Sequence, residues 1–328
     1  MIATDDRLLA IEGLTLDIED LDGVAHILDG VTLDIRAGER VALVGESGCG
    51  KSLTARIVIG LMQARGARIG GSIRFGVDEL LELDSAGWDR LRGRRIAMIF
   101  QDPVAALNPV FTIEDQLRAV IRRGKRAVSR SQAFKIARDG LLAVAINDPE
   151  RVLASYPFQL SGGLNQRVMI AMALINQPLL VLADEPGTAL DVTVQAQTLA
   201  LMQDLTEAAG AAVLLITHNL GVVRNFAQRV YVMYAGRIVE QAPVRTLFSS
   251  PLHPYTQALF AAVPRLTGEA LPQGIEGFVP DYRHPPPGCR FQPRCPKASN
   301  DCLRPPPRIE VSPGHEVACV LYGASAHV

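Results

Sequence analysis

The chain has 328 residues, of which 48% are hydrophobic and 20% are charged, and its formal net charge at pH 7 is −1. This size suits one large globular domain with an appendage, or two domains. A nonspecific nucleic-acid binder would carry a clear basic excess, so we expect no nucleic-acid partner. The short basic stretch at residues 122–130 is interpreted as a solvated helix face.

No apolar run reaches the roughly 18–20 residues that span a bilayer. The longest candidate, Val168–Ile175, is followed directly by Asn-Gln-Pro. Residues 1–7 contain two aspartates and lack the apolar segment of a signal peptide. We therefore expect a cytoplasmic chain whose attachment to a membrane comes through a partner.

Apolar periodicity predicts the elements in chain order. A glycine-rich loop at 45–50 lies between a short apolar strand and a segment of helical spacing at 52–62. Residues 112–175 are predicted to be mostly helical, and the regions beyond residue 245 to form a small irregular appendage rich in proline and cysteine. The expected strands are 8–18, 31–35, 40–44, 96–100, 179–183, 213–217, 230–234 and 237–240.

The glycine-rich loop matches the phosphate-binding pattern G-x-x-x-x-G-K-[ST] at every fixed position. Its glycines allow successive N–H groups to point at phosphate oxygens, and the following helix adds its positive N-terminal end. Lys51 is expected to contact the β- and γ-phosphates, and the Ser52 hydroxyl to ligate Mg²⁺. The predicted ATP-binding residues of the loop are Gly45, Glu46, Ser47, Gly48, Cys49, Gly50, Lys51 and Ser52.

Two acidic residues directly follow the predicted apolar strand at 179–183. Ligands of parallel sheets bind at the carboxyl ends of strands, where Asp184 and Glu185 are expected to lie. Asp184 is predicted to hold the Mg²⁺ shell. Glu185 is predicted to act as the general base that polarises the attacking water.

The segment Leu160–Gln166, LSGGLNQ, resembles the LSGGQ signature of ABC ATPases. Its serine and two glycines, followed by a helix start, can form a second anion cradle. The resemblance implies that this cradle contacts the ATP bound by an opposite subunit, so that two nucleotides lie at a dimer interface. The residues carried over are Ser161, Gly162, Gly163 and Gln166.

Three further motifs stand in the order of that family. Gln101 resembles the Q-loop glutamine, which reaches Mg²⁺ and the water. Asp191 resembles the D-loop aspartate, and His218 the switch histidine that contacts the γ-phosphate. Together these motifs extend over residues 45–218, and the resemblance covers essentially the whole chain.

The resemblance implies an α/β fold: a RecA-like P-loop NTPase core with an antiparallel β subdomain and an inserted α-helical subdomain at about 102–170. The predicted domains are residues 1–245 for the ATPase and 246–328 for the C-terminal region with its cysteines. One feature departs from the family, because no aromatic residue precedes Phe75 to stack on adenine. His26 and Ile27 are the available substitutes.

Residues 100–109 and 251–264 resemble the ATPases of dipeptide, oligopeptide and nickel importers, as does the cysteine pattern of the tail. The four tail cysteines, spaced C-x5-C-x6-C-x16-C, lack the C-x-x-C pairs of common zinc sites. A 4Fe–4S cluster is the favoured interpretation, with zinc, and unligated thiols or disulfides, as alternatives. The proposed ligands are Cys289, Cys295, Cys302 and Cys319.

The resemblance implies an importer subunit that lies peripherally on the cytoplasmic face of the inner membrane. Its expected partners are a second, related ABC ATPase in a heterodimer, two permease chains and an extracytoplasmic binding protein. The alternatives are a soluble ABC ATPase of DNA repair or translation, and a regulatory subunit that binds ATP without hydrolysing it. The sequence leaves the cargo open.

Overall fold

The computed structural model describes residues 6–62, 64–124, 127–187, 192–262 and 274–323. The chain forms two compact units, each built from separated segments. The first unit comprises residues 1–6, 35–40 and 82–216. The second unit comprises residues 7–34, 41–81 and 217–328. The predicted boundary at residue 245 stays a prediction.

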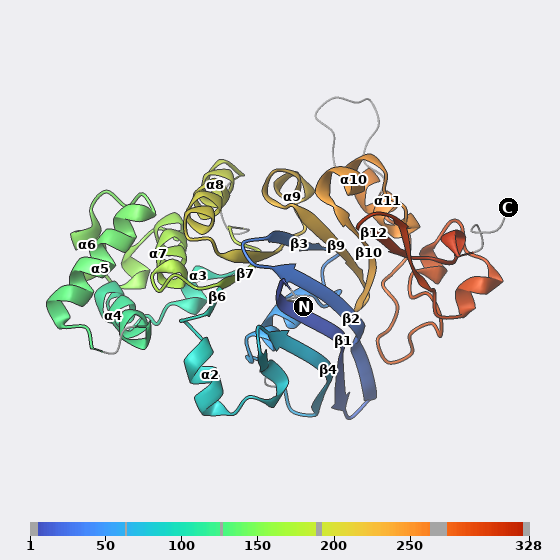
Figure 1. Ribbon diagram of the computed structural model, residues 1–328, viewed down its shortest axis with the longest axis horizontal. Coiled ribbons are helices and arrows are strands. Elements are labelled where there is room, and N and C mark those ends of the chain that lie inside the picture. The colour runs from blue at the N-terminus through green and yellow to red at the C-terminus, as the bar shows by residue number, and fades with distance from the viewer. Residues whose placement is uncertain (1–5, 63, 125–126, 188–191, 263–273, 324–328) are drawn as a thin grey trace, which may run out of the picture. The chain divides into compact units, whose positions relative to one another are not determined.

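The first unit contains three parallel strands in the order β8-β7-β6, and every residue of these strands is buried. Apart from Asp184 at the end of β7, the strand sequences are apolar, as strands buried on both faces of a parallel sheet must be. Helices α4 to α7 pack on one another within the unit (Figure 1). Its elements are α2 (Ser85–Leu91), β6 (Ile96–Ile99), α3 (Pro103–Ala106), α4 (Ile113–Gly124), α5 (Arg130–Ala143), α6 (Pro149–Ala154), η2 (Pro157–Gln159), α7 (Gly162–Leu174), β7 (Leu180–Asp184), α8 (Val192–Ala208) and β8 (Ala212–Ile216).

Side-chain caps fix where the helices of the first unit begin. Ser129 and Gln132 form a reciprocal capping box at the start of α5. Asp148 caps α6, whose first residue is Pro149, and a proline at this position needs no hydrogen-bond acceptor. The predicted helical stretch at 112–175 is therefore confirmed as a set of short, separately capped helices.

The second unit contains a four-stranded sheet, β2-β1-β4-β5, and a second set of strands in the order β11-β12-β10-β9-β3. In the second set β3 and β9 are parallel, and β9, β10, β12 and β11 pair antiparallel. The elements before the tail are β1 (Arg7–Asp20), β2 (Gly23–Arg36), β3 (Arg40–Val44), α1 (Lys51–Val58), β4 (Ala67–Phe75), β5 (Asp78–Glu79), η1 (Leu80–Glu82), α9 (Leu220–Phe226), β9 (Arg229–Tyr234) and β10 (Arg237–Pro243).

The tail combines irregular segments with two strands that the sequence pattern did not indicate. Strand β12 pairs with β10 through Glu240–Val317 and Gln241–Glu316, so the tail extends a sheet of the second unit. Buried Tyr255 and Phe291 join the apolar core around β9 and β10. The tail elements are α10 (Val244–Ser249), α11 (Pro254–Ala261), η3 (Gln292–Arg294), η4 (Asn300–Leu303), β11 (Arg308–Ser312), β12 (His315–Ala318) and η5 (Val320–Tyr322).

No helix within the described residues combines the length and apolar character needed to cross a membrane.

Candidate functional site

The glycine-rich loop leaves β3 and leads into α1, as the motif predicts. Gly45 has a φ of 154°, and a Cβ at this position would lie 2.1 Å from the carbonyl oxygen of Met233. Gly50 caps α1 with a φ of 108°, in a region that favours glycine. Glycine is therefore required at position 45 by the close approach of the Met233 carbonyl, and it is favoured at position 50 by the left-handed backbone.

Lys51 begins α1 and is 5% exposed. Its Nζ donates hydrogen bonds to the carbonyl oxygens of Gly45 and Glu46, both at 2.8 Å. Cys49 lies within 3.6 Å of the same Nζ, and burial raises the pKa of its thiol. A buried thiol with a raised pKa is a poor nucleophile. Ser52 lies in the first turn of α1.

Three side chains of the tail contact this loop, and none of them was predicted from the sequence. The Glu46 N–H donates to the Tyr255 hydroxyl at 2.8 Å. The Tyr282 hydroxyl donates to the Gly48 carbonyl at 2.8 Å. Arg294 donates to both carboxylate oxygens of Glu46, at 2.8 and 3.2 Å. No short motif carries these contacts, because the partners lie more than 200 positions apart in the chain.

The Glu46–Arg294 pair is a bidentate, charge-assisted contact. The Arg294 side chain is 4% exposed and that of Glu46 is 26% exposed. Burial by itself would lower the pKa of Arg294, but the hydrogen bonds to Glu46 and Tyr234 raise it overall. Arg294 therefore stays charged although it is buried, and a buried charge is costly unless an opposite charge, here that of Glu46, is paired with it.

The acidic site lies in the first unit, where β7 ends at Asp184. Asp184 is 2% exposed, and Glu185 follows it with a φ of 45°, a left-handed conformation that a residue with a side chain adopts at a cost. The Glu185 N–H donates to the Ile216 carbonyl at 2.8 Å, which fixes this turn. Gln101 Nε2 donates to Glu185 Oε2 at 3.2 Å, so the structure brings two of the predicted site residues together.

The predicted signature segment forms the start of α7. Ser161 caps this helix, and its Oγ accepts a hydrogen bond from the Leu164 N–H at 3.4 Å. Ser161 and Gly162 are exposed, as a contact with another subunit requires. Gln166, in contrast, is 1% exposed, and its Nε2 has no partner among the described residues. Its contact with a nucleotide of another subunit stays a prediction.

The remaining predicted site residues lie in different parts of the chain and differ in their exposure and contacts. His218 is an exposed residue of the second unit, two positions before α9. His26 Nδ1 lies 2.8 Å from Asp17 Oδ1, and Ile27 is partly buried. Asp191 lies outside the described residues. The roles of these residues toward a nucleotide stay predictions.

The four tail cysteines line one pocket of the second unit, together with the buried His253. Burial raises the pKa of Cys289 to about 11, and burial also raises the pKa of Cys295 and Cys319. Charge repulsion from Cys302 adds to each of these shifts, and the shared pocket brings the four thiols toward one another. Within the described residues, however, no three His, Cys, Asp or Glu side chains are placed to share one metal ion.

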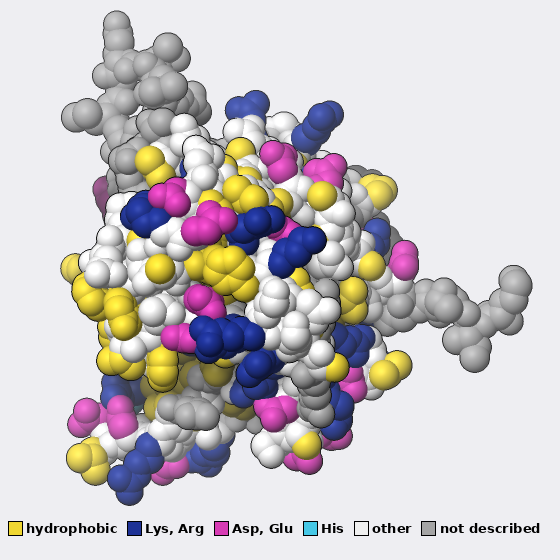
Figure 2. Space-filling view, turned by 90° about the vertical axis from the view of Figure 1, so that its left-hand side faces the viewer, with side chains coloured by type: hydrophobic (Ala, Val, Ile, Leu, Met, Phe, Trp, Pro, Cys, Tyr) yellow, Lys and Arg dark blue, Asp and Glu magenta, His cyan; other side chains and the backbone are white. Residues whose placement is uncertain are grey.

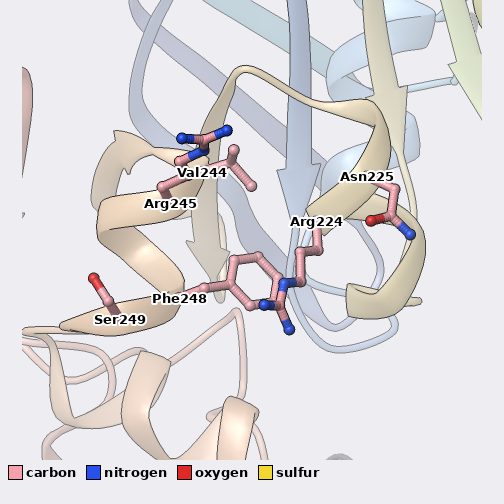
Figure 3. Close-up of a pocket in the computed structure, with 6 residues that line it drawn as sticks. All are labelled: Arg224, Asn225, Val244, Arg245, Phe248 and Ser249. Atoms are coloured by element: carbon pink, nitrogen blue, oxygen red, sulfur yellow. The ribbon is translucent and has the colours of Figure 1, made fainter.

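A second pocket of the same unit, about 390 Å³ in volume, lies between α9 and α10 (Figure 3). Arg224 and Asn225 line it from α9, and Phe248 lies opposite on α10. None of its lining residues belongs to a predicted motif, and the pocket holds no pair of groups suited to phosphate transfer.

Two protein families match parts of this chain. The model described as ABC transporter matches residues 28–188, and the model described as oligopeptide/dipeptide transporter, C-terminal region, matches residues 239–302. The second match includes the first three tail cysteines and Arg294.

Similar proteins share both regions. A probable peptide ABC transporter ATP-binding protein of Sinorhizobium fredii is 48% identical over 93% of this chain and 94% of its own. An oligopeptide transport ATP-binding protein of Bacillus subtilis is 46% identical over 90% of each chain. A solved dimeric ATP-binding cassette with ADP and inorganic phosphate bound is 29% identical and has a TM-score of 0.65. That structure covers 72% of this chain, and this chain covers 99% of it.

Proposed function

Because the chain belongs to the ATP-binding proteins of oligopeptide and dipeptide ABC transporters, we propose that it hydrolyses ATP to power peptide uptake through membrane permeases. The observation that carries this proposal is the Gln101–Glu185 contact at the end of β7, in a chain that also has a complete phosphate-binding loop. A carboxylate that is oriented by an amide beside a magnesium-binding aspartate is what activation of a water molecule needs.

Each site residue has a distinct proposed role. Lys51 and the loop N–H groups bind the β- and γ-phosphates, while Ser52, Gln101 and Asp184 hold Mg²⁺. Glu185 accepts the proton of the attacking water, and His218 stabilises the γ-phosphate. When bound, Mg²⁺ would neutralise the negative charge that develops on the phosphate oxygens.

The exposed Ser161 and Gly162 support a role for the α7 N-terminus at the ATP of a second ATPase subunit. We propose a dimer of nucleotide-binding domains, built from this chain and a related ATPase, with two nucleotides at the interface. Asp191 is the proposed D-loop residue of this interface. ATP binding closes the dimer, and hydrolysis at Glu185 reopens it.

The assembly is proposed to contain two permease chains, and the helical part of the first unit, about 102–170, is the proposed docking region for permease coupling helices. Hydrophobic side chains lie among charged ones on the face that carries α4 to α6 (Figure 2). Large apolar side chains are exposed on the segments next to the helices, as surfaces that bind partners often show. They include Val110, Phe111, Tyr156 and Phe158. We propose that an extracytoplasmic binding protein completes the assembly, and that this chain lies peripherally on the cytoplasmic face of the inner membrane.

The tail cysteines support a 4Fe–4S cluster as a resident group. Four thiolates of one zinc ion would lie about 3.8 Å apart, given Zn–S bonds of about 2.3 Å, and no such close group is found among the described residues. A cluster takes one thiolate per iron and spreads them further apart. Four thiols that line one pocket, two of them buried and two partly buried, fit this donor set, with Cys289, Cys295, Cys302 and Cys319 as ligands.

The transport function is tested with the purified complex of this chain, its partner ATPase, the permeases and the binding protein in proteoliposomes. ATP hydrolysis should rise when the binding protein is loaded with peptide. Peptide uptake should be lost in the Glu185→Gln variant and kept in the Glu82→Gln variant, whose exposed acid lies outside the site. A rate of ATP hydrolysis that does not change when the peptide-loaded binding protein is added would refute the importer function.

The cluster is tested by metal analysis of the full chain purified without oxygen. We expect about four irons and about four sulfides per chain, and their loss in the Cys302→Ser variant. A stoichiometric content of zinc, or no metal at all, would refute the cluster while leaving the ATPase function intact.

A further inference from the structure

We infer that Arg294, a residue of the C-terminal region, is a positioning residue for the phosphate-binding loop and sets the affinity of the chain for Mg·ATP. The inference concerns residues of the second unit alone, so it does not depend on the cargo, the partners or the cluster.

Every polar group of Glu46 is engaged. Its N–H donates to Tyr255, and its carbonyl accepts from Lys51, the residue expected to bind the phosphates. Its carboxylate receives two hydrogen bonds from Arg294. Glu46 therefore joins the lysine of the loop to the C-terminal region through consecutive hydrogen bonds.

Arg294 itself is held rigidly. Its Nε donates to the Glu276 carbonyl at 2.9 Å, and one Nη donates to the Ile275 carbonyl at 2.9 Å. A third contact, at 3.3 Å, reaches the Tyr234 hydroxyl. A guanidinium fixed by backbone carbonyls keeps its planar fork in one orientation, so it can hold the Glu46 carboxylate in one place.

The segment that carries Arg294 is anchored on both sides. Phe291 is 1% exposed and packs on Tyr234 and Tyr255, with ring centroids 5.1 and 5.4 Å apart. Cys289 and Cys295 flank the segment and face the cysteine pocket. The aromatic cluster thus forms the base from which Arg294 reaches Glu46.

Charge explains why this contact should matter for ATP. A carboxylate one residue from the start of a triphosphate cradle repels phosphate oxygens and competes for the ammonium group of Lys51. Arg294 removes this effect because it neutralises the carboxylate and holds both of its oxygens. Without Arg294, Glu46 keeps its charge and loses its fixed position.

The test is a double-mutant cycle on the full chain, with Mg·ATP affinity measured by calorimetry. Arg294→Gln should weaken the affinity on the order of tenfold, in the range of interaction energies between neighbouring residues. Glu46→Gln removes the repelling carboxylate but leaves the buried Arg294 without its charged partner, so it should lower the unfolding temperature and weaken the affinity less than Arg294→Gln does. In the Glu46→Gln background, Arg294→Gln should add little, because the carboxylate that it neutralises is gone.

Three controls separate positioning from folding. Arg294→Lys restores the charge without the fork and should give an intermediate affinity. Arg304→Gln removes an exposed arginine of the same region and should leave the affinity unchanged. In steady-state hydrolysis, Arg294→Gln should raise KM more than it lowers kcat, whereas a general loss of fold would lower kcat in proportion to the unfolded fraction.

An unchanged Mg·ATP affinity in Arg294→Gln would overturn the inference. So would an equal loss of affinity with and without the Glu46 carboxylate, because that result would mean that Arg294 acts only through general stability. A wild-type chain that fails to bind Mg·ATP would instead contradict the nucleotide site itself.

Discussion

The two units position their functional residues in different ways. In the first unit, Gln101 and Glu185 lie just after the ends of two neighbouring parallel strands, β6 and β7. In the second unit, side chains of the distant C-terminal tail hold the phosphate-binding loop. The β6–β7 register pairs Ile99 with Ala183, and this pairing alone brings the two strand ends together. Glu46, by contrast, contacts residues 209 and 248 positions away. A complete loop motif can therefore still depend on a distant segment for its geometry.

The largest effect should come from the locally built acidic site. Glu185→Gln removes the proposed general base, so ATP hydrolysis should fall by roughly 10²–10⁴-fold. Mg·ATP binding should persist, because the loop that grips the phosphates belongs to the second unit. The check is hydrolysis and nucleotide affinity measured side by side, with Glu82→Gln as the control. Hydrolysis within about threefold of wild type would be inconsistent with catalysis by Glu185.

The next effect concerns the backbone of the loop. Gly45→Ala places a Cβ 2.1 Å from the Met233 carbonyl oxygen, so it should cost more than about 3 kcal/mol of stability and abolish Mg·ATP binding. Gly48→Ala meets nothing within 4 Å, and only its φ of 80° opposes the side chain. We expect about 1–2 kcal/mol for this control. Thermal unfolding of both variants makes the comparison, and equal losses would contradict it.

A smaller effect should come from the tail contact to the same loop. Tyr255→Phe removes the oxygen that accepts the Glu46 N–H, which should cost about 1–3 kcal/mol and weaken Mg·ATP binding severalfold. The matched control is Tyr322→Phe, which removes a hydroxyl bonded to the Leu252 carbonyl elsewhere in the tail. Both variants should lower the unfolding temperature, but only Tyr255→Phe should change the affinity. A loss of affinity in both would argue against a specific contact.

The smallest effect should come from a carboxylate held by near neighbours. Glu79 accepts hydrogen bonds from Ser72, Ile73 and Leu81, and although burial opposes the shift, these bonds lower its pKa. A lowered folded-state pKa means stability that is present above the unfolded value and is lost as the pH falls through the folded value.

Glu79→Gln should therefore destabilise the chain by roughly 0.5–1 kcal/mol at pH 7. The difference from wild type should shrink as the pH falls below about 4.5, the unshifted value. Denaturant unfolding at pH 7 and pH 4 measures this, and Mg·ATP affinity at pH 7 should stay unchanged. A difference that grows on acidification would contradict the sign of the pKa shift.

The sequence by itself determined the elements that depend on local rules. Wholly apolar segments predicted the buried parallel strands, and the strand, loop and helix around Lys51 follow from glycine positions and helical spacing. Ser161 begins α7 because its hydroxyl caps the helix that follows it. The acids at the end of β7 were found because parallel strands present their carboxyl ends at one edge of a sheet.

Only the tertiary structure decided what holds the phosphate-binding loop. The tail was expected to be irregular, yet β12 pairs with β10, and Arg294, Tyr255 and Tyr282 reach the loop. No periodic pattern in the sequence indicates such contacts. They form because packing around buried rings such as Phe291 brings distant segments of the chain together. Periodicity reports which residues are buried, and it carries no information on which distant side chain will meet a given backbone N–H or carboxylate.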